Sequence, residues 1–223
     1  MSAATRGRRE GRPSGDERQR SIVEVFEGLL RMRPLAEITV DEIAAGAAIS
    51  RSAFYFYFAS KQAVLLELLD RMVAEVDERL AGIGVPGDDP AAWWRSSIGV
   101  FVDVFGDHRA VSVTLAEARA TVPEIREEWA RRSGRWVDLT ASTIVAERRK
   151  GRAREIVDPR ATSVALNAMN ERVLVASFAG EQPALGQDEL LDVLADVWCT
   201  TIYGTPPPLT GGGRRAAPPR HGG

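Results

Sequence analysis

The sequence predicts an all-α fold, because helical periodicity runs through most of the chain and no strand pattern holds up anywhere in it. Between residues 20 and 203, apolar side chains recur at three- and four-residue spacing in one segment after another. Glycine and proline interrupt this spacing and mark the expected helix ends. With 223 residues and 44% hydrophobic side chains, the chain is long and apolar enough to bury a substantial core.

The expected helices follow one another from residue 20 to residue 203. Pro34 ends the first of them, and a glycine- and proline-containing stretch at residues 84–90 ends the fourth. In chain order, the helices are expected at residues 20–32, 40–45, 51–58, 61–82, 91–106, 109–120, 123–149, 159–179 and 188–203.

Two short helices at residues 40–58 form the most informative segment of the sequence. Thr39 is placed to cap the first helix, with Glu42 three residues later as in a capping box. Gly46 falls where a sharp turn with a left-handed residue fits, and Ser50 is placed to cap the second helix. A short helix, a tight turn and a second short helix are the arrangement of a helix-turn-helix DNA-binding motif.

The second short helix carries side chains suited to DNA. Hydroxyl groups, ammonium groups and helix N-termini all donate hydrogen bonds to phosphate. The base-reading candidates are Arg51, Ser52 and Ala53, and the phosphate-binding candidates are Thr39, Ser50, Tyr55, Tyr57 and Lys61. The alternative is that the aromatic run at residues 54–58 forms a buried strand or a core cluster, but the caps on both sides argue against it.

The charge distribution is unusual for a DNA-binding protein, since the net charge is −2. Residues 1–20 carry six arginines and three acidic residues, whereas residues 21–70 carry four basic and seven acidic residues. DNA binding would therefore depend on local donors and on the basic N-terminal arm rather than on bulk attraction. This arm either tracks phosphates or a minor groove, or serves only as a solubilising leader.

Composition and motifs argue against several other classes of protein. No apolar run approaches the length of a membrane span, and the N-terminus is too rich in arginine for a signal peptide. Cys199 is the only cysteine, which excludes an internal disulfide and fits a reducing cytoplasm. His108 and His221 are the only histidines, and no metal-ligand cluster, nucleophile motif or phosphate-binding loop is present. We therefore expect no catalytic residue, metal or cofactor, and a cytoplasmic location.

Aromatic side chains gather on the helices of the second half of the chain. Trp94, Ile98, Phe101 and Phe105 recur at helical spacing on one narrow stripe, and Trp136 and Thr140 share a face of a later helix. Trp198 lies on the last helix. Large rigid rings of this kind line many apolar ligand cavities, although a stripe of this type is more often ordinary core.

Two asparagines add polar groups to an otherwise apolar helical face. Asn167 and Asn170 lie three residues apart on the face that also carries Leu174 and Phe178. A buried amide without a partner costs a few kcal/mol, so both amides need hydrogen bonds from each other, the backbone, water or a ligand. A satisfied core or interface network is the alternative. Glu171 flanks the same face, and the sequence suggests no role for it.

These motifs resemble those of the TetR family of bacterial repressors. The family pattern in residues 35–69 is supplied by Thr39, Ile43, Ala44, Ala48, Ile49, Ser50, Tyr55, Phe58, Ser60 and Lys61. Over roughly residues 6–204 the chain is also similar to the ethionamide-resistance repressor branch of that family. The shared residues are 12–16, 54–58, 63–66, 94–95, 105–106, 166–167, 169–172, 176–183 and 201–204.

The resemblance implies a long, mostly apolar channel in the second domain, with asparagines supplying its hydrogen bonds. The implied lining residues are Trp94, Ile98, Phe101, Phe105, Trp136, Thr140, Asn167, Asn170, Leu174 and Trp198. The chain departs from the branch at Ser97, Leu139, Val175, Arg132 and Ser133, so a shared ligand is not implied. The resemblance also implies a homodimer built on the helices at residues 159–179 and 188–203, which would place two motifs in successive major grooves of a pseudo-palindrome.

The sequence therefore predicts four segments. These are a disordered basic arm (1–19), a three-helix helix-turn-helix DNA-binding domain (20–60), a larger helical bundle for ligand sensing and dimerisation (61–204), and a disordered Pro/Gly tail (205–223). The expected function is ligand-responsive, sequence-specific transcription regulation. The protein would be a repressor that leaves a double-stranded DNA operator when an apolar small-molecule effector binds. Two alternatives remain, namely an all-α carrier of hydrophobic ligands without DNA function and a DNA-organising protein without an effector.

Overall fold

A computed structural model describes residues 14–155 and 158–204. Over these residues the chain forms nine α-helices and one short 3₁₀ helix, with no strand, which confirms the predicted all-α fold. In chain order the elements are α1 (Gly15–Leu30), η1 (Leu35–Glu37), α2 (Val40–Gly46), α3 (Arg51–Tyr57), α4 (Lys61–Ile83), α5 (Pro90–Asp107), α6 (Arg109–Thr121), α7 (Pro123–Arg149), α8 (Pro159–Ala179) and α9 (Gln187–Tyr203).

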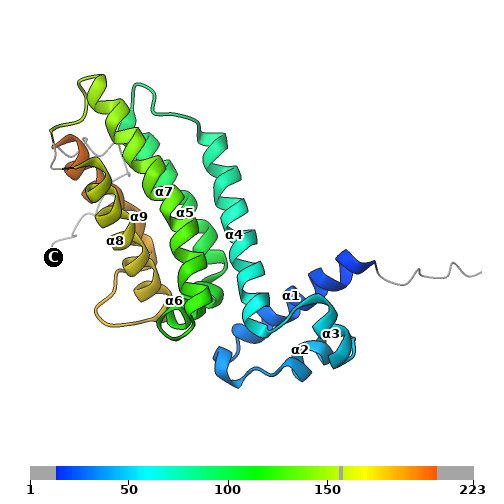
Figure 1. Cartoon of the computed structure of the whole chain (residues 1–223). Coiled ribbons are helices and arrows are strands. Elements are labelled where there is room, and N and C mark those ends of the chain that lie inside the picture. The colour runs from blue at the N-terminus through cyan, green and yellow to red at the C-terminus, as the bar shows by residue number, and fades with distance from the viewer. Residues whose placement is uncertain (1–13, 156–157, 205–223) are drawn as a thin grey trace, which may run out of the picture.

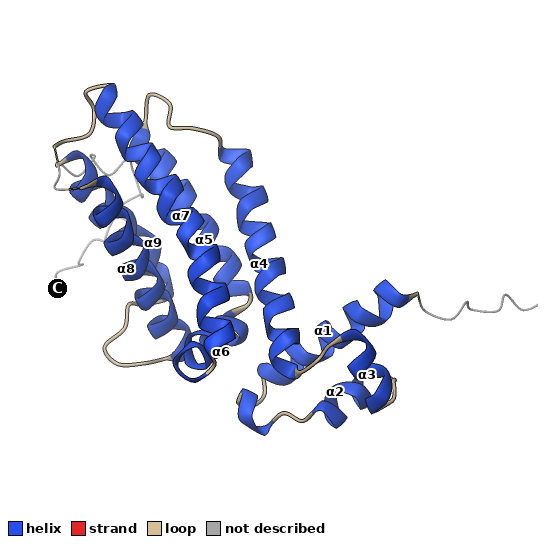
Figure 2. Ribbon diagram, viewed as in Figure 1, coloured by secondary structure: helices blue, strands red, loops and turns tan. Residues whose placement is uncertain are grey.

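The helices form two groups that are joined by α4 (Figure 1). Helices α1, α2 and α3 pack together at one end of the molecule, and α4 extends from them along the side of a larger bundle made by α5–α9. Helix α6 lies at the end of this bundle nearest the small group and contacts α1, and only loops connect the helices (Figure 2). One hydrophobic core continues from α1 through α4 into α5, α6 and α7, and a second joins α5, α8 and α9.

Helix α1 begins earlier than the sequence indicated, at Gly15 rather than at residue 20. The reason is a capping box, in which the Ser14 hydroxyl accepts from the backbone N–H of Glu17 while the Glu17 carboxylate accepts from the backbone N–H of Ser14. Residues 14–19 therefore belong to the helical domain and not to the predicted arm. The rest of that arm and the predicted Pro/Gly tail lie outside the described residues.

The turn between α2 and α3 differs from the sequence expectation in one respect. The left-handed residue is Ala48, with φ 53°, and not Gly46, which is the last residue of α2. Gly46 is needed there for a close approach, because a Cβ atom on it would lie 2.5 Å from Cγ1 of Val25 on α1. The expected caps are confirmed, since Thr39 forms a capping box with Glu42 and the Ser50 hydroxyl accepts from a backbone N–H of α3.

The remaining helices begin and end within a few residues of their expected positions. Helix α3 ends at Tyr57 because Phe58 is extended, and α5 and α8 each begin with a proline that follows an aspartate cap. Among the helices of residues 14–155 and 158–204, none combines the length and the apolar character that crossing a membrane requires.

Candidate functional site

Helix α3 buries one side and exposes another. Phe54 is 0% exposed and Phe58 is 7% exposed, so both belong to the core. The opposite side presents the exposed residues Arg51, Ser52, Tyr55 and Phe56. Phe56 is 83% exposed, which is unusual for a phenylalanine and was not expected. The predicted contact residues Ala53 and Tyr57 are only partly exposed.

Arg51 and the serines of this helix already make contacts in the absence of DNA. The Arg51 guanidinium donates to the Asp41 carboxylate at 2.6 Å and to the Tyr55 hydroxyl at 3.4 Å. Asp41 and, after it, Tyr55 raise the pKa of Arg51, so this side chain stays fully charged. The Ser50 and Ser52 hydroxyls lie 2.9 Å apart, and Ser50 also accepts from the backbone N–H of Ala53. DNA would have to compete with Asp41 for Arg51.

Lys61 and Thr39 are engaged within the protein. The Lys61 ammonium, at the start of α4, donates to the carbonyls of Leu35 at 2.6 Å and Ile38 at 2.7 Å. The ammonium therefore ties the start of α4 to the segment between α1 and α2. The sequence had instead suggested that it would contact a DNA phosphate. The Thr39 hydroxyl accepts from the backbone N–H of Glu42 and donates to its carboxylate at 2.7 Å.

The larger bundle encloses a cavity of about 220 Å³. All ten residues that were expected to line a channel lie on the wall of this single space: Trp94, Ile98, Phe101, Phe105, Trp136, Thr140, Asn167, Asn170, Leu174 and Trp198. Four of the five positions at which the chain departs from its branch also line it, namely Ser97, Leu139, Val175 and Ser133. Arg132, the fifth, turns to Asp70 on α4, to which its Nε donates at 2.8 Å. The aromatic stripe therefore belongs to the hydrophobic cores and also forms part of the cavity wall.

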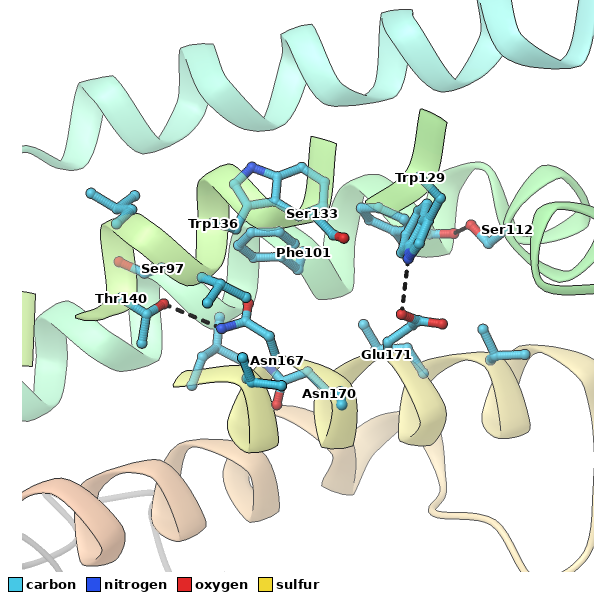
Figure 3. A pocket seen from close by; sticks show the side chains of 18 of the residues that line it. Ser97, Phe101, Ser112, Trp129, Ser133, Trp136, Thr140, Asn167, Asn170 and Glu171 are labelled. Atoms are coloured by element: carbon cyan, nitrogen blue, oxygen red, sulfur yellow. Dashed lines mark hydrogen bonds between the residues drawn. The ribbon is translucent and has the colours of Figure 1, made fainter. Parts of the chain in front are cut away.

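Both asparagines make hydrogen bonds at the cavity wall, and Figure 3 shows the one from Asn167 to Thr140. The Asn167 amide donates to the Thr140 hydroxyl at 3.3 Å and to the Ser163 carbonyl at 2.9 Å, and the Asn170 oxygen accepts from the Trp198 indole at 2.8 Å. These bonds leave the Asn167 oxygen and the Asn170 amide nitrogen without a partner among the described residues. Each asparagine thus keeps one hydrogen-bonding group for a ligand or water.

Glu171, for which the sequence suggested no role, belongs to a second polar cluster on the cavity wall (Figure 3). Its carboxylate pairs with the Arg119 guanidinium of α6 and accepts from the Trp129 indole of α7 at 3.1 Å. The Arg119 guanidinium also lies over the Trp129 ring, 4.6 Å from its centroid. Sequence reasoning missed this cluster because Glu171 is 42 residues from Trp129 and 52 residues from Arg119 in the chain, and the only signal was an acid on an apolar face.

A third network fixes one end of the cavity. Glu147 on α7 is 0% exposed; burial would raise its pKa, but hydrogen bonds from Arg152 and Lys150 outweigh this and lower it. The Tyr203 hydroxyl lies 3.5 Å from the Glu147 carboxylate and accepts from the Trp94 indole at 3.0 Å. This buried charge network therefore positions a tryptophan of the cavity wall.

Within residues 14–155 and 158–204, no group of three or more histidine, cysteine, aspartate or glutamate side chains could hold a metal ion.

Comparisons with known proteins identify the two parts of the molecule. The family described as bacterial regulatory proteins, tetR family, matches residues 22–68, and the C-terminal domain of the transcriptional regulator EthR matches residues 94–204. EthR of Mycobacterium tuberculosis (strain ATCC 25618 / H37Rv) is 49% identical over 206 residues, which cover 92% of this chain and 95% of that protein. The chain belongs to the TetR family.

Other relatives agree with this assignment. EthR of Mycolicibacterium smegmatis is 40% identical over 204 residues, which cover 91% of this chain and 94% of that protein. Among solved structures, Thermus thermophilus FadR with lauroyl-CoA has a TM-score of 0.58 at 22% identity, covering 92% of this chain and 100% of its own. A regulator from Saccharomonospora viridis with choline has a TM-score of 0.68 at 22% identity, and the match covers 84% of this chain and 98% of that one. These two share the fold, and the chain is an EthR-like helix-turn-helix transcriptional regulator.

Proposed function

We propose that this EthR-like regulator is a homodimeric repressor that leaves its operator when an apolar small molecule fills the cavity of the α5–α9 bundle. The observation that carries the proposal is the convergence of ten expected lining residues on one cavity, in the domain that matches the C-terminal domain of EthR. The structures of Thermus thermophilus FadR with lauroyl-CoA and of the Saccharomonospora viridis regulator with choline, which share this fold, support small-molecule binding. The role is regulatory and not enzymatic.

The DNA side of the proposal rests on the exposed face of α3. Arg51 and Ser52 would contact base edges, with Ala53 beside them at the groove surface. Thr39, Ser50, Tyr55 and Tyr57 would contact phosphates through hydroxyl groups, while Lys61 would contribute by holding the domain together. Two copies of α3 would enter successive major grooves of a pseudo-palindromic operator.

The proposed dimer uses α8 and α9. Val193 of α9 is 40% exposed, a large apolar side chain without cover in a single chain. A second copy would bury such residues, as homodimers commonly do. The spacing between the two recognition helices would then depend on how each bundle holds its α4.

Ligand binding would act on DNA affinity through α4 and α6. Leu80 of α4 lines the cavity, and His108, which precedes α6, lies 2.9 Å from the Glu27 carboxylate of α1 through its Nδ1. A ligand that prefers an arrangement with widely spaced recognition helices lowers the affinity for the operator. A differential of about 1–3 kcal/mol would release DNA about 5–150-fold.

Fluorescence anisotropy tests this proposal. Purified protein is titrated against DNA from directly upstream of its own gene at two salt concentrations, with random DNA as competitor. We expect specific, salt-dependent binding and its loss when apolar compounds are added, while tryptophan fluorescence reports their entry into the cavity. Tryptophan quenching without specific DNA binding would indicate a carrier, and DNA binding without any quenching would indicate a DNA-organising protein. Either result would refute the proposal.

A further inference from the structure

The cavity wall contains a charged pair in otherwise uncharged surroundings. Arg119 of α6 and Glu171 of α8 are the only charged residues among those that line the cavity within the described part of the chain. Their side chains are 20% and 31% exposed, so both charges are largely removed from bulk water. An ion pair in such a place is costly to desolvate, and apolar residues of similar size would stabilise the fold equally well. The pair therefore calls for an explanation other than stability.

In this pair, every carboxylate oxygen of Glu171 accepts a hydrogen bond, but one N–H group of Arg119 has no acceptor. Both oxygens of Glu171 accept a bond, one from Arg119 and one from Trp129. The Nε–H of Arg119, in contrast, is buried and has no partner. Among the described residues, only three side-chain polar atoms with almost no solvent-accessible surface lack a partner, and two of them, on Arg119 and Ser97, belong to residues of this cavity wall. Unpartnered buried groups concentrated around one cavity indicate that a ligand completes them.

The charge of the pair restricts which polar group of a ligand can bind beside it. The pair is neutral as a whole, so a ligand carboxylate near Arg119 would also lie beside the Glu171 carboxylate and would be repelled by it. An uncharged carbonyl oxygen can accept from Arg119 without this penalty. An amide fits best, because its oxygen accepts from the guanidinium while its N–H faces the carboxylate.

The position of the pair indicates how such a ligand would lie. Glu171 follows Asn167 by four residues in α8, which corresponds to about 6 Å along the helix axis. The apolar wall made by Phe101, Phe105 and Trp136 runs beside these two polar points. A ligand with a polar group at Arg119 and Glu171 can therefore extend an apolar chain along the aromatic side chains.

We propose that Arg119 and Glu171 form a subsite for an uncharged amide-like group, so that this regulator selects neutral elongated ligands over fatty carboxylates. The inference rests on the proposed ligand-sensing function and specifies the chemical class of the ligand. Glu171 acts as the selecting residue, because it neutralises the guanidinium that would otherwise attract an anion.

Decanamide and decanoate test the subsite, since they differ only in replacing an amide nitrogen by a charged oxygen. Calorimetric titration of the wild-type protein should give at least tenfold tighter binding of decanamide. In Glu171→Gln, which keeps an acceptor for Trp129 but frees the charge of Arg119, the ratio of the two affinities should shift at least tenfold toward decanoate. The matched control is Glu127→Gln on α7, an exposed position at which the ratio should not change.

The outcomes separate this inference from the proposed function. Both compounds could bind and release operator DNA, but with equal affinities or with an affinity ratio that is unchanged in Glu171→Gln. In that case the proposed subsite is wrong, whereas the proposed ligand-sensing function is supported. If neither compound binds the wild-type protein, the ligand-sensing function and the subsite fail together. The wild-type ratio needs no variant, so it decides the question even if Glu171→Gln does not fold.

Discussion

Replacing Lys61 by methionine distinguishes a structural role of this side chain from a role in binding phosphate. The ammonium donates to the Leu35 and Ile38 carbonyls at 2.6 and 2.7 Å, and it thereby ties the start of α4 to the segment between α1 and α2. Methionine keeps most of the aliphatic stem but cannot donate either bond. The two carbonyls then lose their charged partner in a partly buried place.

The expected size of the effect follows from these two hydrogen bonds. A bond to a charged group contributes about 1.5–3 kcal/mol, and partial exposure places both bonds at the lower end of this range. The free energy of unfolding should therefore fall by about 3 kcal/mol. For a protein of this size, that corresponds to a decrease in Tm of roughly 6–12 °C. If Lys61 contacted a phosphate, its replacement would instead reduce the salt dependence of DNA binding by about one unit per subunit.

Two measurements on Lys61→Met decide between the roles. Urea unfolding followed by circular dichroism should show the loss of stability, and anisotropy titrations at several salt concentrations should show an unchanged salt slope at a temperature where the variant is folded. Arg51→Met is the matched control, because Arg51 is exposed on α3 and its loss should weaken DNA binding while leaving Tm nearly unchanged. A normal Tm together with a reduced salt slope in Lys61→Met would refute the structural role.

Four further predictions follow from single side chains. Phe56→Ala should weaken operator binding about tenfold, but it should have little effect when thymines of the operator are replaced by deoxyuridine, because an exposed ring on α3 would contact thymine methyl groups; an equal loss on both DNAs would argue against such contacts. Asn167→Leu should weaken polar ligands about tenfold more than hydrocarbons in calorimetric titrations, since it removes one amide from the cavity wall, and equal losses would count against an orienting amide. Glu42 has its pKa lowered from 4.5 to about 2, first by the backbone N–H and then by the hydroxyl of Thr39, so its ionised form contributes stability above pH 4.5 that is lost as the pH falls toward 2; the Tm difference between wild type and Glu42→Ala should shrink over that range, and a constant difference would contradict the assignment. Burial raises the pKa of Cys199 to about 11, so this thiol should resist iodoacetamide at pH 8 until the protein is unfolded, and rapid labelling of the native protein would contradict the burial.

Local sequence patterns were sufficient for the helices, whereas the set of cavity-lining residues was implied by the resemblance to the family and not by spacing alone. Trp94, Ile98, Phe101 and Phe105 occur at helical spacing, which places them on one side of α5 wherever that helix packs. Caps were equally local, because Thr39 and Glu42 interact three residues apart. The same logic explains the late start assigned to α1, since its capping box at Ser14 lies in a polar segment without apolar periodicity.

Contacts between distant residues could not be predicted in this way. The hydrogen bonds from Lys61 go to backbone carbonyls. Because every residue has a carbonyl, the sequence does not show which ones accept these bonds. The pairing of Arg119 with Glu171 depends on which helices become neighbours in the bundle. Phe56 was considered only as part of the aromatic run at residues 54–58 and received no role of its own, although Phe54 and Phe56, two positions apart, lie on different sides of a helix.

Coupling between the cavity and the DNA-binding domain requires little energy in this architecture. Helix α6 carries Arg119 toward the cavity and also contacts α1, and the pair of His108 and Glu27 is the one described hydrogen bond between α1 and the corner of α5 and α6. Phe178 of α8 lines the cavity and also the groove between α6 and the end of α1. A hydrogen bond from a charged donor contributes about 1.5–3 kcal/mol, which lies within the roughly 1–3 kcal/mol typical of allosteric coupling. A ligand that bonds Arg119 in only one arrangement of α6 would therefore supply enough free energy to shift the recognition helices.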